Sequence, residues 1–250
     1  MSNRTLALYV SASGTLAMTR GSGLAPLVSA HDDLSQVDWS ALASALREEF
    51  GTVRVQLLLS AKQCRYLVLP WLSSRYTGAA IRDYVAEAFT ATASVSSTSH
   101  LIEIDWPPYG EPILAAAYPR TIVDTLRDGL AAAGLGLLGV EGSIGPVLRR
   151  YGRMLDTTQA LLAYAEDDGI TGITVEAGKV VQIESLPCEA DGLDQIAVWA
   201  SRKQFAFDDD DRLCWLATAS KPDAYAGRLI PVESSVVPVC AGHAVALAWQ

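Results

Sequence analysis

The chain has 250 residues, half of them hydrophobic and 19% charged, a composition that can bury a sizeable core and argues against global disorder. Its 19 basic and 28 acidic residues give a net charge of −9, which argues against nucleic acid or an anionic lipid surface as the main partner. The 4 cysteines lie far apart without a CxxC pair, which favours reduced thiols over zinc sites or disulfides. No apolar run approaches the roughly 18 residues of a membrane-spanning helix, so we expect a cytoplasmic protein without a transmembrane segment.

Three strands joined by tight turns are predicted at the N-terminus, followed by a helix. The predicted strands span residues 4–10, 15–20 and 26–31. Turn residues separate them at Ser11–Gly14 and again at 21–23. Asp38 is placed to cap the helix, which repeats apolar residues at helical spacing and ends at Gly51.

Strands and helices alternate through the middle of the chain. Strands are predicted at 53–59, 64–69, 100–105, the run ILAAAYP from Ile113 and the run LGLLGVEGS from Leu135. One helix begins at Thr77, a second ends near Gly134, and a third is opened by Ser143 as a candidate cap.

The second half begins as the first does, with three strands joined by tight turns. These strands are predicted at 159–165, 170–175 and 179–186, with turns at Asp168–Gly169 and at Gly178. A helix starting at Asp191 or Asp194, strands at 212–217 and 228–231, and a C-terminal helix complete the pattern.

This repeated order of elements predicts a duplicated α/β architecture of the actin-like (ribonuclease H-like) kind. We expect two lobes, each with a three-stranded meander followed by alternating helices and strands. The first lobe is predicted to span residues 1–141, with a small inserted subdomain around 53–118, and a shorter second lobe to span 142–250.

Three stretches carry a family resemblance: YLVLPWLSSRYTGAAIRDYVAEAF, HLIEIDW, and the run from ILAAAYP to VLRRY. Their order and texture resemble the PilM-type and GspL-type actin-like proteins of type IV pilus and type II secretion platforms, and the closing AVALAW is similar to the apolar terminal helix of that family. The resemblance implies a cytoplasmic protein, peripheral at the inner membrane, that holds other assembly components. Its implied partners are the cytoplasmic tail of an inner-membrane assembly protein and the assembly motor ATPase.

Several members of that family bind ATP, which requires an Asp and a turn rich in Gly, Ser or Thr to face the phosphates and Mg²⁺. The first turn offers Ser11, Ser13 and Gly14 but no carboxylate, and an ordinary hairpin turn explains it equally well. The second offers Asp168 and Gly169, preceded by Asp167, in a pattern that is also the strongest plain hairpin signal. The Gly-Gly pair expected near the adenine is missing from residues 215–220. We therefore expect a vestigial ATP/Mg site and no cofactor.

Other catalytic chemistry has little support in the sequence. GxxxxGK[ST], HExxH and GxSxG motifs are missing, and His31, His100 and His243 are scattered, which argues against a metal site or a histidine-centred triad. The alternative to a non-catalytic protein is an ATPase or small-molecule kinase of the same architecture, with a shifted site at Asp167 or Asp168.

Two aromatic loops are candidate partner-binding surfaces, because Trp, Tyr and Arg often anchor interfaces. The candidate residues are Trp71, Arg75, Tyr76, Trp106 and Tyr109. The alternative is that both tryptophans fold back onto the core. The acidic run Asp208–Asp211 is predicted to be a solvated turn. Together the patterns predict a non-catalytic scaffold, a pseudo-ATPase, that acts through protein–protein interaction.

Overall fold

The computed structural model describes residues 5–12, 14–19, 27–30, 34–72, 77–151, 159–166, 168–186, 199, 202, 213–217 and 228–231. Four predicted elements lie outside these residues: the turn at 21–23, the helix from Asp191 or Asp194, the turn Asp208–Asp211 and the C-terminal helix. The described residues form three sheets. None of the helices in these ranges is long and apolar enough to cross a membrane.

The first sheet has the strand order β3-β2-β1-β4-β8. Its strands are β1 (Thr5–Val10), β2 (Gly14–Thr19), β3 (Leu27–Ala30), β4 (Arg54–Leu59) and β8 (Gly136–Gly142). The first three form the predicted antiparallel meander, whereas β4 runs parallel to β1 and β8 runs parallel to β4. Residues 6–10 of β1 are all buried, as expected for a central strand covered on both faces.

The second five-stranded sheet repeats this topology with the order β11-β10-β9-β12-β13. Its strands are β9 (Gln159–Glu166), β10 (Gly169–Glu176), β11 (Lys179–Leu186), β12 (Leu213–Ala217) and β13 (Arg228–Pro231). Again three antiparallel strands are followed by two parallel ones. The duplicated order predicted from the sequence is therefore confirmed.

A small third sheet has the order β5-β7-β6 and belongs to the first half of the chain. Its strands are β5 (Arg65–Leu69), β6 (His100–Asp105) and β7 (Ile113–Pro119), and α2 (Gly78–Ala93) covers one face. Thr77 caps α2 through its side-chain oxygen, as predicted. The predicted insertion began at residue 53, but β4 belongs to the first sheet, so the small sheet starts only at β5.

Helices α1 (Trp39–Phe50) and α3 (Arg120–Ala132) pack together against the first sheet. Asp38 caps α1 as predicted, accepting hydrogen bonds from two backbone N–H groups. The two helices approach closely where Gly129 faces the backbone of Trp39, because a Cβ atom at this glycine would lie 2.9 Å from the Trp39 carbonyl oxygen.

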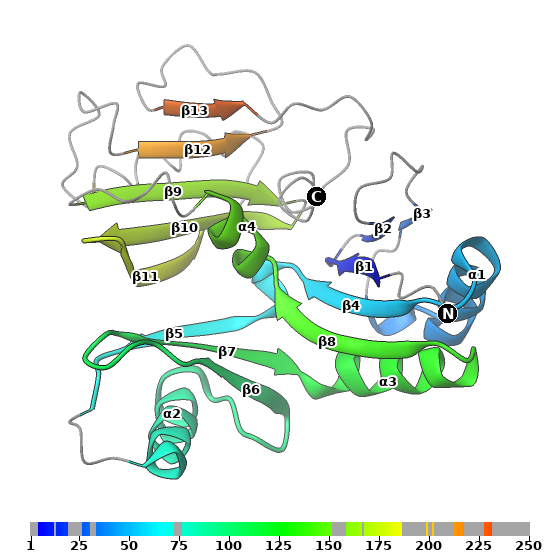
Figure 1. Cartoon of the computed structure of the whole chain (residues 1–250), viewed down its shortest axis with the longest axis horizontal. Coiled ribbons are helices and arrows are strands. Elements are labelled where there is room, and N and C mark those ends of the chain that lie inside the picture. The colour runs from blue at the N-terminus through cyan, green and yellow to red at the C-terminus, as the bar shows by residue number, and fades with distance from the viewer. Residues whose placement is uncertain are drawn as a thin grey trace.

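The fourth helix, α4 (Ile144–Tyr151), joins the two halves. Figure 1 shows it between the second sheet and the end of β8. Its Ile144 and Val147 belong to an apolar cluster that also contains Tyr9 of β1 and Leu162 of β9. The two halves of the chain therefore share one core across α4.

Candidate functional site

Three serines line the edge of the first sheet that faces the second half. Ser11, Ser60 and Ser143 directly follow β1, β4 and β8, and all three are fully buried. The N–H of Ser60 donates to the carbonyl of Val10 at 2.8 Å, and that of Ser143 to the carbonyl of Leu59 at 2.8 Å. The carboxyl ends of three neighbouring parallel strands therefore meet here, which is where open α/β sheets usually place their ligand sites.

Two carboxyl groups of the second half reach this edge. Asp168 lies in the β9–β10 turn, and its Oδ2 accepts hydrogen bonds from the Ala12 N–H at 3.1 Å and from the Ser60 hydroxyl at 2.6 Å. Glu166 ends β9, where it accepts from the Tyr9 hydroxyl at 3.0 Å and from the Ala61 N–H at 2.9 Å. We call Glu166, Asp168 and these four donors the carboxylate bridge.

The bridge joins the two turns that the sequence singled out. Ser11 and Gly14 close the first turn on itself, since the Ser11 N–H and hydroxyl both donate to the Gly14 carbonyl, at 2.9 and 3.1 Å. In the second turn the side chain of Asp168 binds Ala12 and Ser60 of the first half. Gly169 pairs with Glu166 as the first residue of β10, so the hairpin turn comes one residue earlier than predicted because β9 extends to Glu166. Ser13 and Asp167 lie outside the described residues.

The bridge holds Glu166 and one oxygen of Asp168 away from water. Burial raises the pKa of Glu166 to about 8, an effect opposed by the Ala61 N–H and reinforced by the nearby charge of Asp168. The other oxygen of Asp168, Oδ1, is buried and makes no hydrogen bond within the described part of the chain. Ser143, predicted as a helix cap, shares a hydrogen bond of 2.9 Å between its hydroxyl and that of Tyr164.

Tyr9, Ser60 and Glu166 belong to this cluster but were not predicted from the sequence as site residues. One signal was available, because each apolar strand run of the first sheet that points toward the second half ends in a serine. The four N–H and hydroxyl donors of the cluster already donate hydrogen bonds to carboxyl groups of the same chain. Among the described residues no group of three or more His, Cys, Asp or Glu side chains is placed to hold a metal ion.

A groove separate from the carboxylate bridge runs between the small sheet and β8, and the start of α4 lines one end of it. It consists of two adjoining hollows of about 500 and about 420 Å³, which share Glu103 of β6 and Val140 of β8. Every residue of β8 lines one hollow or the other, as expected of an edge strand that presents its backbone. The opposite wall is the face of the small sheet that α2 leaves uncovered, with Asp105, Leu114 and Tyr118 among its residues.

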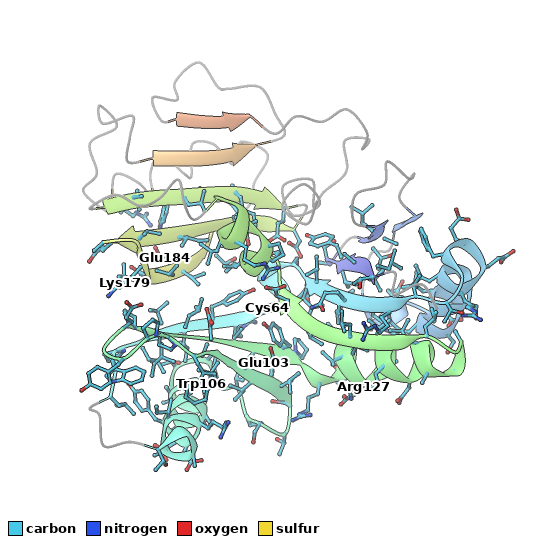
Figure 2. All side chains as sticks on the ribbon, viewed as in Figure 1. Cys64, Glu103, Trp106, Arg127, Lys179 and Glu184 are labelled. Carbon is cyan, nitrogen blue, oxygen red and sulfur yellow. The ribbon has the colours of Figure 1, made fainter. Side chains whose placement is uncertain are left out.

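The groove carries an excess of acid. Glu141 binds Arg149 through both carboxylate oxygens, the bond to Oε2 being 2.9 Å, and Arg127 at the far end pairs with Asp124 at 2.6 Å. Glu103 and Asp105 add two further carboxylates on the sheet wall (Figure 2 labels Glu103 and Arg127). Partial burial, and then the charge of Glu141, raise the pKa of Glu103. A cation in the groove would relieve this repulsion.

The predicted aromatic residues form a separate cluster beside α2. Trp71 contacts Tyr109 edge to face, with ring centroids 5.7 Å apart, and it packs on the core of the small sheet. Trp106 does not fold back onto the core: it is 47% exposed and lies under the Arg82 guanidinium, 5.4 Å from the ring centroid. Tyr109 is 71% exposed. Arg75 and Tyr76 lie outside the described residues.

Several solved structures are similar to this chain over most of its length. A Bacteroides thetaiotaomicron protein with an actin-like ATPase fold matches with a TM-score of 0.60 at 11% identity, covering 98% of this chain and 95% of that one. The fold is actin-like. The cytoplasmic domain of EpsL, an inner-membrane component of the type II secretion system of Vibrio cholerae, matches with a TM-score of 0.62 at 10% identity, covering 98% of this chain and 94% of that one. A PilM–PilN type IV pilus biogenesis complex matches with a TM-score of 0.52 at 14% identity, covering 81% of this chain and 66% of that one.

These likenesses are structural only. No family model matches the sequence, and no curated protein matches it. The predicted actin-like fold, similar to that of PilM-type and GspL-type proteins, is confirmed at the level of the fold.

Proposed function

We propose that this protein is a non-catalytic cytoplasmic scaffold that holds an extended segment of an inner-membrane assembly protein in the groove between β8 and the small sheet. The groove is the observation that carries the proposal. Its β8 wall presents a strand edge that pairs with no other described strand, and its sheet wall is acidic. An extended segment can add to such an edge by main-chain hydrogen bonds.

The charge of the groove indicates the chemistry of the segment. Glu141 and Asp124 each pair with an arginine, whereas Glu103 and Asp105 add two further negative charges to the groove. A basic side chain is therefore favoured between the walls. Cytoplasmic segments next to membrane spans are rich in Lys and Arg. The exposed Leu138 of β8 and Leu114 of β7 offer apolar contact for alternate side chains of the same segment.

The structural neighbours are consistent with this role. One is a domain of an inner-membrane component of a type II secretion system, and another was solved as a complex of PilM with PilN in type IV pilus biogenesis. We propose by analogy that this chain serves a secretion or pilus platform of one of these kinds and lies at the inner membrane. The assembly motor ATPase remains a predicted second partner, for which the aromatic cluster of Trp71, Trp106 and Tyr109 is the candidate surface.

A catalytic role has less support than a scaffolding role. The donors that an actin-like protein would turn toward phosphates are bound to Asp168 and Glu166 in this chain. The bridge therefore supports a non-enzyme, and the ATPase or kinase alternative needs Asp168 to leave the Ala12 N–H and the Ser60 hydroxyl before it could serve Mg²⁺ or a phosphate.

The groove can be tested with short synthetic peptides that tile the cytoplasmic segments of inner-membrane proteins from the same cell. We expect a basic peptide to bind, and Glu103→Lys to weaken its binding about tenfold or more, since reversal of the charge adds repulsion. Glu48→Lys on the exposed side of α1 is the matched control and should have little effect. Peptides N-methylated at alternate positions should also bind more weakly, because they lose main-chain hydrogen bonds to β8.

The pH dependence of peptide binding gives a further check. Because the pKa of Glu103 is raised, this side chain gains a proton at a higher pH than an ordinary glutamate, so binding of a basic peptide should weaken as pH falls through that range. Binding that survives Glu103→Lys but is lost in Trp106→Ala would move the site to the aromatic cluster and reject the groove.

A further inference from the structure

The actin-like ATPase fold implies a nucleotide whose phosphates lie between the two turns, and the residues at these turns do not fit that group. The Ala12 N–H and the Ser60 hydroxyl, which face the space between the turns, already bind Asp168 Oδ2 at 3.1 and 2.6 Å. The groups that contact the two carboxyl groups in the described part of the chain are hydroxyls and backbone N–H groups, with no Lys or Arg among them. Phosphates would meet two acidic side chains without a compensating cation from the described part of the chain.

We propose that Asp168 and Glu166 take the place of the nucleotide phosphates, so that the chain holds its two halves together by its own carboxyl groups. The geometry of the bonds supports this assignment. Asp168 comes from the second turn and binds donors that follow β1 and β4, while Glu166 binds one donor on β1 and one after β4. Each carboxyl group thus spans the same two strands from the opposite half, as a bridging ligand would.

The sequence distances show why this is an interaction between halves and not a local turn. Asp168 lies 156 residues from Ala12 and 108 from Ser60 along the chain. Glu166 lies 105 residues from Ala61. The bonds therefore form only when the halves are closed on one another.

The bridge also adjoins the groove. Ser143 bonds Tyr164 at the bridge, and the next two residues, Ile144 and Gly145, line the larger hollow. A closure made by the protein itself would keep this part of the groove in one shape whatever the nucleotide concentration.

Hydrogen exchange at single amides tests the inference in the protein without any ligand. We expect the amides of Ala12 and Ala61 to be protected in the wild-type protein, and inorganic pyrophosphate or Mg-ATP to leave both their exchange and the melting temperature unchanged. Exchange at the rate of free amides, or a melting temperature raised by either probe, would overturn the proposal.

Asp168→Ala tests whether the Asp168 side chain occupies donors that would otherwise bind phosphate. We expect Ala12 exchange to accelerate at least tenfold and the vacated donors to gain measurable affinity for pyrophosphate by calorimetry. Glu176→Ala, at the exposed far end of β10, the strand that follows Asp168, should change neither. If Mg-ATP binds the wild type and Asp168→Ala abolishes that binding, Asp168 serves a nucleotide and does not replace one. Should Asp168→Ala fail to fold, Asp168→Asn with the same two measurements replaces it, and the wild-type exchange data still decide.

Discussion

At the scale of single residues, the most informative group is a glutamate that no motif would select. Glu166 is buried between Tyr9, Ser143 and the Ala61 N–H, with the carboxylate of Asp168 close by. A buried carboxyl group without a cation beside it is more stable with its proton on. Glu166 therefore keeps its proton to about pH 8, although it accepts hydrogen bonds from the Tyr9 hydroxyl and the Ala61 N–H.

This pKa shift makes folding stability depend on pH. Below the ordinary Glu pKa of 4.5 the group is protonated in both states, and above about 8 it is ionised in both. Between these values only the unfolded state loses its proton, so the Glu166 contribution favours folding at low pH and is lost as pH rises, at up to about 1.4 kcal/mol per pH unit.

Glu166→Gln should remove this slope, because the amide keeps the shape of the side chain without titrating. Urea unfolding at several pH values between 5 and 8 measures it, with the difference between wild type and variant isolating the one group. Glu176→Gln, an exposed carboxyl on the same hairpin, should leave the slope as in the wild type. Equal slopes for wild type and Glu166→Gln would show that the buried acid does not titrate in this range.

At the scale of elements, strand order determines both candidate sites. Because β1, β4 and β8 are parallel and adjacent, their carboxyl ends place three serines side by side. Because β8 is the last strand of its sheet, its other edge is left for the groove. Helices α1 and α3 pack on one face of this sheet. The two helices also contact each other, and their backbones come close together at Gly129.

Gly129 allows that close crossing, so its replacement should be costly. A valine there would meet the Trp39 carbonyl oxygen, which lies 2.9 Å from the position of a Cβ atom, and backbone cannot move aside as a flexible side chain can. We expect Gly129→Val to lower the free energy of unfolding by about 1–3 kcal/mol or more. Ala131→Val, two residues along on the exposed side of α3, carries the same β-branched side chain and should cost under about 1 kcal/mol. Similar losses for both variants would mean that the helices can separate at this crossing.

At the scale of the whole molecule, the sequence predicted what depends on local pattern. Tight turns between short apolar runs marked both meanders, and the caps Asp38 and Thr77 fixed the starts of two helices. The carboxylate bridge could not be predicted in this way, since its bonds join residues more than a hundred positions apart. The groove was not predicted, because the pattern of apolar and polar residues in a strand does not show whether that strand lies at the edge of its sheet.

The shared core across α4 predicts that the two halves unfold together. Leu58 of β4, Ile144 of α4 and Leu162 of β9 belong to one buried cluster, so neither half can expose its side of the cluster without exposing the other. Variants that retain a single tryptophan, either Trp39 in the first half or Trp199 in the second, should report one and the same urea midpoint.

Leu162→Ala tests the same coupling from within the cluster. Its side chain is fully buried, so the substitution should lower the free energy of unfolding by about 2–5 kcal/mol. The loss should appear equally at Trp39 and at Trp199, although the substitution lies in the second half. Leu138→Ala removes the same atoms from a side chain that is 45% exposed and should cost far less. A midpoint that moves at Trp199 but stays fixed at Trp39 would show that the halves are independent, and the carboxylate bridge would then join two bodies that fold separately.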